Sequence, residues 1–304
     1  MRGATATRTG DSGLDRLRDE LLRTGTRSIA RRTSLRRVLA IGCLAVTIGG
    51  CGAVGTPKRP APAGDDQGYL TASSPIDAIA FLRPPPETDS VAQRHDEEVA
   101  AAAVALRGGP RWTIATADAE FMNKALAASS FECALGVPLS QDGTPATMHL
   151  LGRVRTDVMT VSRDVKTHFQ RPRPFMVNGQ PTCSPGDEKL LRGNGAYPSG
   201  HAMLGWLWAL TLADVAPEHA QALLARGRAY GESRVVCNVH WRSDVIAGRD
   251  LADVAATLVR GNPAYQRDVE AARREIRRLS TSGTPSSRDC AAETAALGTP
   301  LPAQ

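Results

Sequence analysis

Outside its first 50 residues the chain has no excess of either charge. Ten of its 37 Lys and Arg residues, all arginines, lie in residues 1–50 with four of its 31 acids. The rest of the chain therefore carries 27 basic and 27 acidic residues. Because the formal charge of +6 belongs to the N-terminal segment alone, the main argument for a nucleic-acid-binding protein is removed.

Three further features are missing. No Cys-x-x-Cys pair occurs, which argues against a structural zinc site. Few stretches alternate polar and apolar residues with a period of two, which argues against a sheet protein. The apolar run Val38–Ile48 is too short to span a bilayer.

That apolar run follows arginines at 31, 32, 36 and 37, as in a secretory signal peptide, so residues 1–50 are predicted to be a signal peptide. Small residues precede Cys51, the pattern of a bacterial lipoprotein cleavage site. We expect an exported, periplasmic or cell-envelope protein, and both lipidation at Cys51 and plain cleavage nearby are open. Arg31-Arg32 loosely resembles a twin-arginine signal, so the export route is open as well.

The remainder reads as one helical domain. Residues 51–70 are rich in Pro, Gly and Ala and predict a flexible tether. Helical spacing and caps predict an all-α, single-domain bundle over residues 71–280, and residues 281–304 predict a disordered tail. The expected helices cover residues 89–107, 111–128, 147–169, 199–215, 217–232, 241–259 and 262–279.

Four cysteines remain outside the leader, an even number that fits two disulfides in an oxidising compartment. They are Cys133, Cys183, Cys237 and Cys290, and spacing alone leaves three connectivities open.

Cations in two separated segments have the pattern of a phosphate site. Lys166 is followed after six residues by Arg173-Pro174, and Ser233-Arg234 stands upstream of a histidine. Paired guanidinium donors match phosphate oxygens, and phosphoryl transfer depends mainly on such electrostatic stabilisation. Pro172 disfavours helix at the preceding residue, so we expect Arg173 on an irregular segment after a helix end.

Two histidines complete the pattern. Pro198-Ser199-Gly200-His201 predicts a helix start, where Ser199 caps and Gly200 lets an anion approach the backbone N–H groups. His240 and Asp244 stand four residues apart, which predicts neighbours on one helix face. A carboxylate on one imidazole nitrogen leaves the other free to attack phosphorus.

These segments resemble the type 2 phosphatidic acid phosphatase superfamily, which includes vanadium haloperoxidases, and within it the bacterial class A non-specific acid phosphatases. The resemblance extends to Phe81-Leu82-Arg83-Pro84-Pro85-Pro86, Asn194-Gly195-Ala196-Tyr197 and Gly231-Glu232-Ser233-Arg234. It implies a helical bundle with the site between central helices. It also implies hydrolysis of diverse phosphate monoesters at acidic pH, through a phosphohistidine and without metal or other cofactor.

By the same resemblance His240 is the nucleophile, Asp244 orients it, and His201 protonates the leaving group. The phosphate-binding residues are then Lys166, Arg173, Ser199, Gly200 and Arg234. The expected partners are small phosphate monoesters, with inorganic phosphate as product. No nucleic acid is expected, contact with a membrane only through the possible lipid anchor, and the oligomeric state is open.

The resemblance also favours the disulfide Cys183–Cys237, which leaves Cys133–Cys290. The chain departs from the family pattern at Ala202, at Asn238-Val239 and at Arg242, which bears on substrate preference. Two alternatives are a vanadate-dependent haloperoxidase, which uses the same kind of anion pocket, and an inactive phosphate-binding lipoprotein. A membrane-embedded lipid phosphatase conflicts with the charges near the motifs, such as Asp157, Arg163 and Arg226.

Overall fold

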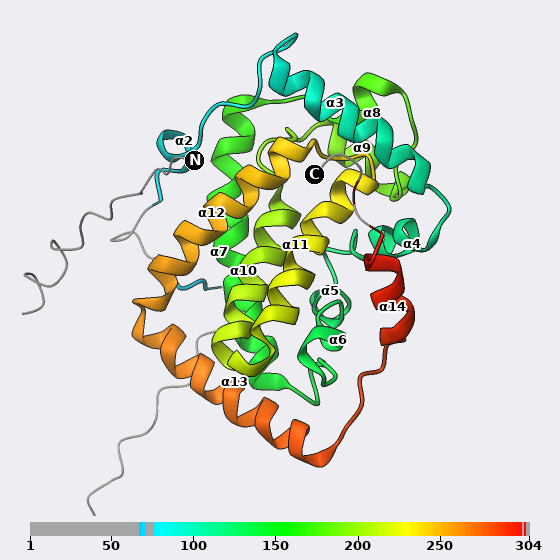
Figure 1. Cartoon of the computed structure of the whole chain (residues 1–304). Coiled ribbons are helices and arrows are strands. Elements are labelled where there is room, and N and C mark those ends of the chain that lie inside the picture. Colours follow the sequence, from blue (N-terminus) through cyan, green and yellow to red (C-terminus); the bar gives the residue numbers. More distant parts are fainter. Residues whose placement is uncertain (1–66, 71–75, 300, 302–304) are drawn as a thin grey trace, which may run out of the picture. The chain divides into compact units, whose positions relative to one another are not determined.

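The computed structural model describes residues 67–70, 76–299 and 301. Within them the chain is helical and has no strand, which confirms the predicted all-α class (Figure 1). The predicted signal peptide and the lipidation candidate Cys51 lie outside the described residues. The helices are α2 (Ala78–Phe81), α3 (Val91–Ala103), α4 (Pro110–Ala117), α5 (Lys124–Ser129), α6 (Glu132–Leu135), α7 (Pro145–Phe169), α8 (Pro174–Asn178), α9 (Glu188–Arg192), α10 (Gly200–Val215), α11 (Ala220–Val236), α12 (Arg242–Arg260), α13 (Pro263–Ser282) and α14 (Cys290–Leu297).

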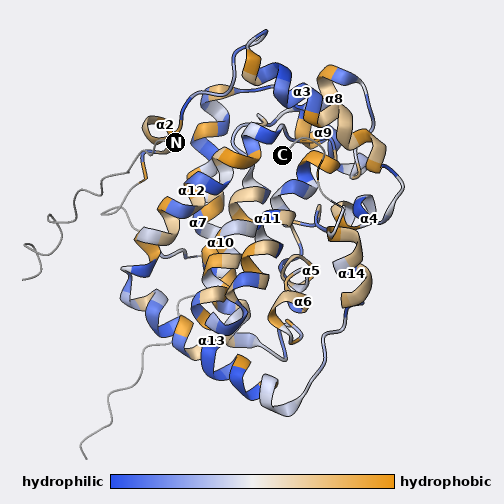
Figure 2. Cartoon of the chain, viewed as in Figure 1, coloured by the Kyte–Doolittle hydropathy of each residue, from blue (hydrophilic) through white to orange (hydrophobic). Residues whose placement is uncertain are grey.

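Helix α10 is the centre of the bundle and packs against α7, α11, α12 and α13. Its sequence is apolar on all sides, as expected of a helix that is surrounded by others. By contrast α13 buries a stripe that includes Tyr265, Val269, Ala272 and Ile276 and carries charged residues elsewhere, so apolar and polar colours alternate along it (Figure 2).

Two glycines let α10 and α11 approach closely. A Cβ on Gly227 would stand 2.8 Å from the carbonyl oxygen of Gly205, and one on Gly205 would stand 2.4 Å from the ring of Tyr230. Neither position accommodates a larger residue without a shift of the helices. The close crossing holds the C-terminal end of α11 beside the start of α10.

A third glycine brings α12 to the same place. A Cβ on Gly248 would stand 2.4 Å from the carbonyl oxygen of Ser199, and the Ser199 N–H donates to the carbonyl of Asp244 at 2.9 Å. The starts of α10 and α12 are therefore joined directly.

The predicted helix over residues 111–128 is wrong in one respect, because it is interrupted. Helix α4 ends at Ala117, and the buried carboxylate of Asp118 accepts hydrogen bonds from Arg226 and Ser233. Asn123 then caps α5. Tertiary hydrogen bonds outweigh the helix propensity of this alanine-rich stretch.

The ends of the domain also differ from the prediction. The tether was expected to reach residue 70, but Tyr69 is buried and its N–H donates to Asp157 at 2.9 Å. The tail was expected to be disordered, but it contains α14, whose Glu293 pairs with Arg226 at 3.2 Å. Burial of a few side chains thus orders segments whose composition is typical of linkers.

Both favoured disulfides are present. Cys183 is bonded to Cys237, and Cys133 is bonded to Cys290. The second bond ties α14 to α6 across a sequence separation of 157 residues.

Candidate active site

Arg173 is buried and held by backbone carbonyls and one imidazole. It lies after the end of α7 and directly before α8, in extended conformation, as Pro172 predicts. Its guanidinium donates to the carbonyls of Val239 at 2.9 Å and Gly195 at 3.3 Å, and it lies 3.0 Å from Nε2 of His240. This cation is therefore fixed in position beside one imidazole.

Lys166 reaches the same loop from the last turns of α7. Its Nζ donates to the carbonyl of Gly195 at 2.9 Å. A Cβ on Gly200 would stand 4.0 Å from its Cε, so Lys166 faces the start of α10.

Arg234 is buried like Arg173 but lacks comparable partners. It is 1 % exposed, and its Nε and Nη1 atoms have no hydrogen-bond acceptor within the described chain. Its backbone carbonyl accepts from the N–H of His240, and its charge contributes to lowering the pKa of both His240 and His201. Buried donors without an acceptor are costly, and an anion bound between these cations would satisfy them.

The start of α10 supplies further donors. Ser199 caps the helix, with its Oγ accepting from the N–H of Ala202 at 3.2 Å. The N–H groups of Gly200 and His201 have no acceptor among the described residues. Free N–H groups at a helix start attract an anion, and here they lie beside Lys166.

His240 and Asp244 form the expected pair, but not on one helix face. Helix α12 begins at Arg242, so His240 precedes it, and Asp244 lies in its first turn. The Asp244 carboxylate reaches back to the N–H of Trp241 at 2.8 Å and to Nδ1 of His240 at 3.3 Å. Because the Asp244 carboxylate accepts from the backbone N–H of Trp241, just before the helix, it also reaches the His240 ring.

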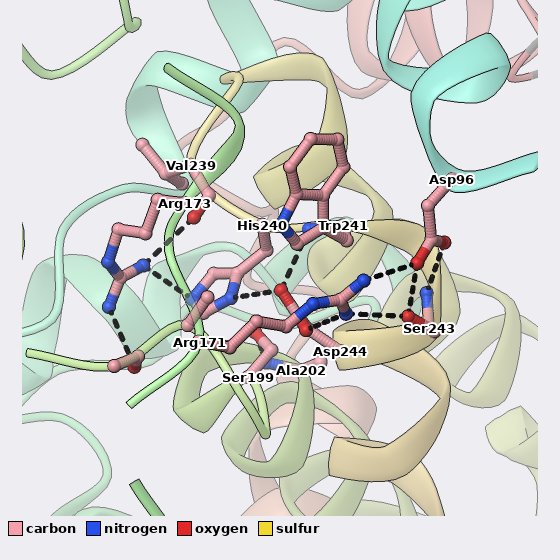
Figure 3. A network of polar contacts seen from close by, with 12 residues as sticks. Asp96, Arg171, Arg173, Ser199, Ala202, Val239, His240, Trp241, Ser243 and Asp244 are labelled. Atoms are coloured by element: carbon pink, nitrogen blue, oxygen red, sulfur yellow. Dashed lines mark hydrogen bonds and ion pairs between the residues drawn. The ribbon is translucent and has the colours of Figure 1, made fainter. Parts of the chain in front are cut away.

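These contacts determine the tautomer of His240. Nε2 faces the donating guanidinium of Arg173, so it accepts, and Nδ1 carries the proton toward Asp244 (Figure 3). The Nε2 lone pair therefore points to the side of the cations, where the Arg173 guanidinium contacts it.

A second ionic network lies behind Asp244. Arg171 is buried, and its guanidinium donates to Asp244 at 2.5 Å and to Asp96 of α3 at 2.8 Å (Figure 3). Ser243 joins the same group through a short hydrogen bond from its hydroxyl to Asp96. Sequence reasoning missed Arg171 and Asp96 as members of the site, because their pairing joins segments 75 residues apart.

His201 is held from the other side of the site. Its Nε2 lies 3.1 Å from the carbonyl of Ala119, and its ring lies 4.7 Å from that of Phe121. This turn between α4 and α5 is anchored in turn by α11, because Asp118 bonds Arg226 and the carbonyl of Glu120 accepts from Tyr230. The interrupted helix thus places a carbonyl against one nitrogen of His201.

Burial and the neighbouring cations lower the pKa of both histidines well below the ordinary histidine value. Burial and the Arg173 guanidinium lower the pKa of Lys166 to about 7, and burial lowers the pKa of Arg234 to about 10. Burial raises the pKa of Asp244, which Arg171 partly offsets. A concentration of positive charge therefore surrounds the two rings.

Residues 147–267 match the model of the PAP2 superfamily. The chain is 37% identical over 222 residues to an acid phosphatase of Zymomonas mobilis, covering 72% of this chain and 83% of that protein. It is 36% identical to non-specific acid phosphatases of Salmonella typhimurium and Providencia stuartii, with 69% of this chain covered and 84% and 85% of theirs.

The chain belongs to the acid phosphatases of the PAP2 superfamily.

The segment matched to the superfamily contains every catalytic and phosphate-binding residue that the sequence predicted, and the structure brings them together. They are Lys166, Arg173, Ser199, Gly200, His201, Arg234, His240 and Asp244. Of the departures from the family pattern, Val239 does contact the site, but through the carbonyl that holds Arg173. Because any residue supplies a backbone carbonyl, valine at this position leaves the contact with Arg173 in this acid phosphatase unchanged.

No group of three or more His, Cys, Asp or Glu side chains within the described residues is arranged to hold a metal ion. Nor does the described chain contain a helix with the length and apolar character to cross a membrane.

Proposed function

We propose that the enzyme hydrolyses phosphate monoesters in two steps through a phosphohistidine at His240. The observation that carries the proposal is the buried guanidinium of Arg234, whose Nε and Nη1 lack acceptors within the described chain. Together with Lys166, Arg173 and the start of α10 it supplies donors for three phosphoryl oxygens. These groups supply the positive charge that phosphoryl transfer requires, and we infer that no metal is needed.

In the first step Nε2 of His240 attacks phosphorus while the bond to the ester oxygen breaks. The proton stays on Nδ1, which donates to the Asp244 carboxylate. This carboxylate stabilises the developing imidazolium. The leaving alkoxide takes a proton from His201. Because the Nε2–H of His201 is directed at the carbonyl of Ala119, the proton comes from Nδ1.

In the second step His201, now neutral, takes a proton from water. The oxygen of that water attacks phosphorus, the bond to Nε2 of His240 breaks, and inorganic phosphate leaves. The same histidine is therefore acid and then base, as a two-step displacement requires.

We expect an acidic pH optimum from the surroundings of His240 and His201. Protonation of His240 at Nε2 is opposed by the facing guanidinium of Arg173, so His240 stays neutral and nucleophilic. Burial and the Arg234 guanidinium lower the pKa of His201, whereas the hydrogen bond to Ala119 and a bound phosphate dianion oppose that lowering, so His201 carries the proton that it donates only at acidic pH. We extend a broad substrate range to this chain because two of the relatives above are named non-specific acid phosphatases.

The test is to trap the intermediate. A rapid quench into alkaline detergent, with nitrophenyl phosphate labelled at phosphorus, is expected to leave the label on His240, in a bond stable to base and labile to acid. His240→Ala is expected to abolish both the label and turnover, whereas His95→Ala, at a half-exposed histidine of α3, is a control that keeps both. Undiminished turnover by His240→Ala, or a label on another residue, contradicts the mechanism.

We also propose export to the periplasm or cell envelope, with residues 1–50 removed and Cys51 as the lipidation candidate. The two disulfides of the domain support an oxidising compartment. Intact-mass measurement of the protein from whole cells distinguishes a lipidated Cys51 from plain cleavage, and a cytosolic full-length chain would contradict export.

A further inference from the structure

Arg155 lies on α7 and has an unused donor. Its Nε is buried without a hydrogen-bond acceptor in the described part of the chain. Its guanidinium carbon lies 5.1 Å from the ring centroid of Phe121, and no ion pair with a described residue is found for it. The catalytic steps proposed above do not use this cation.

The position of Arg155 relates it to the leaving group. The Phe121 ring that it contacts lies 4.7 Å from the ring of His201. The Phe121 centroid lies 4.7 Å from the His201 centroid and 5.1 Å from the guanidinium carbon of Arg155. That carbon is therefore no more than about 10 Å from the centre of the His201 ring. His201 is the residue that protonates the departing oxygen, so Arg155 lies on the leaving-group side of the phosphate.

The face of α7 supports this direction. Arg155, Met159, Ser162 and Lys166 follow at intervals of four, three and four residues, so they share one face. Ser162 is within 3.9 Å of where a Cβ on Gly200 would stand, next to the free N–H groups of α10. One helix face therefore runs from the phosphate-binding Lys166 toward Arg155, about 16 Å apart along the axis.

The opposing turn carries a carboxylate that accepts hydrogen bonds from its own backbone. Glu120 precedes Phe121, and its Oε1 accepts from the N–H groups of Met122 and Asn123 at 2.7 Å and 2.8 Å. It forms no ion pair with Arg155 in the described structure, so the guanidinium keeps its capacity to bind an anion.

We propose that Arg155 and Phe121 form a leaving-group subsite that favours phosphate monoesters carrying a second anionic group, a carboxylate or another phosphate. The proposal rests on the proposed function, because it takes His201 as the side from which the leaving group departs. The aromatic ring of Phe121 contacts the carbon skeleton between the two anions, and Arg155 binds the distal one. Arg155 is a specificity residue and takes no part in bond cleavage.

The test uses two substrates that differ only in distal charge, 6-(phosphonooxy)hexanoate and its carboxamide. The wild type is expected to favour the acid over the amide by about tenfold in kcat/KM, the range of a hydrogen bond to a charged group. Arg155→Gln is expected to remove that preference by raising KM for the acid, with turnover of the amide unchanged. Arg277→Gln, an exposed arginine on α13, is the control of equal charge change and is expected to keep the preference.

Each failure has a distinct signature. A wild-type enzyme that cleaves both substrates with equal kcat/KM contradicts the subsite and leaves the proposed function standing. If Arg155→Gln slows cleavage of the acid and the amide equally, the role of Arg155 is only structural. That result also contradicts the subsite. A wild-type enzyme that cleaves neither these esters nor nitrophenyl phosphate contradicts the proposed function itself.

Discussion

The Nε2 atom of His201 lies 3.1 Å from the carbonyl oxygen of Ala119, and this contact assigns the two nitrogens of the ring. Nε2 donates to the carbonyl, so in the proposed mechanism Nδ1 is the nitrogen that exchanges a proton with substrate or water. The carbonyl lies in the turn that interrupts the predicted helix over residues 111–128. An irregular backbone segment thus orients the imidazole that we propose as the general acid.

If His201 is the general acid, its removal harms basic leaving groups most. His201→Ala is expected to lower the rate of alkyl phosphate cleavage by about 10²- to 10⁴-fold, the usual contribution of general acid catalysis. Nitrophenolate leaves without a proton, so phosphorylation of His240 by nitrophenyl phosphate is expected to stay fast. Water activation is then slow, and stopped-flow absorbance is expected to show a burst of one nitrophenolate per site.

The contrast between substrates is the control in that experiment. Equal loss of rate for both esters, without a burst, would mean that His201 serves only to bind the phosphate.

Arg171 is expected to be essential to the stability of the site. Its loss leaves the carboxylates of Asp96 and Asp244 buried without their shared cation. Breaking a buried pair costs about 3–5 kcal/mol, which for a domain of this size lowers Tm by about 10 °C. Differential scanning calorimetry of Arg171→Gln checks this, with the exposed Arg278→Gln as control, and a Tm equal to wild type would contradict it.

The residues that contact phosphate in the proposed mechanism were predictable from sequence because they lie in short motifs. Lys166 and Arg173, for example, are close in the chain, and Pro172 already predicts the irregular segment between them. The fold class was predictable for a similar reason, since α10 and α13 carry distinct apolar patterns over many turns.

The supporting groups were not predictable in the same way. Asp96 lies within an alanine-rich helix and Ala119 acts through its carbonyl, so neither side-chain type nor spacing identifies them. Helix α14 was missed because its order depends on Cys290 and Glu293 meeting partners far along the chain. Long-range pairing decides these features, and local sequence does not report it.

The pKa of Lys166, lowered to about 7, predicts a change in pH dependence on substitution by arginine. The ammonium must be charged to bind phosphate, and its charge is lost as pH rises through about 7. Arginine stays charged, so the ratio of wild-type to Lys166→Arg kcat/KM is expected to fall as pH increases from 5 to 9. Ionisation of the substrate cancels in this ratio.

The exposed Lys189→Arg is the control, with a ratio expected to be independent of pH. A flat ratio for Lys166→Arg as well would mean that Lys166 stays charged throughout the range.

Two glycines at the starts of α10 and α12 are expected to differ in their roles. Gly200 is expected to be required for phosphate binding and Gly248 for helix packing. A Cβ on Gly200 would lie at ordinary contact distances from Lys166 and Ser162, so Gly200→Ala is expected to keep the wild-type Tm. That methyl group occupies the approach to the free N–H groups of α10, so kcat/KM is expected to fall at least about tenfold. A Cβ on Gly248 would collide with the Ser199 carbonyl at 2.4 Å, so Gly248→Ala is expected to lower Tm instead.

Thermal unfolding and kinetics of both variants check the contrast. A Gly200→Ala variant with full activity would contradict phosphate binding at the start of α10, because the added methyl group stands where an oxygen must approach.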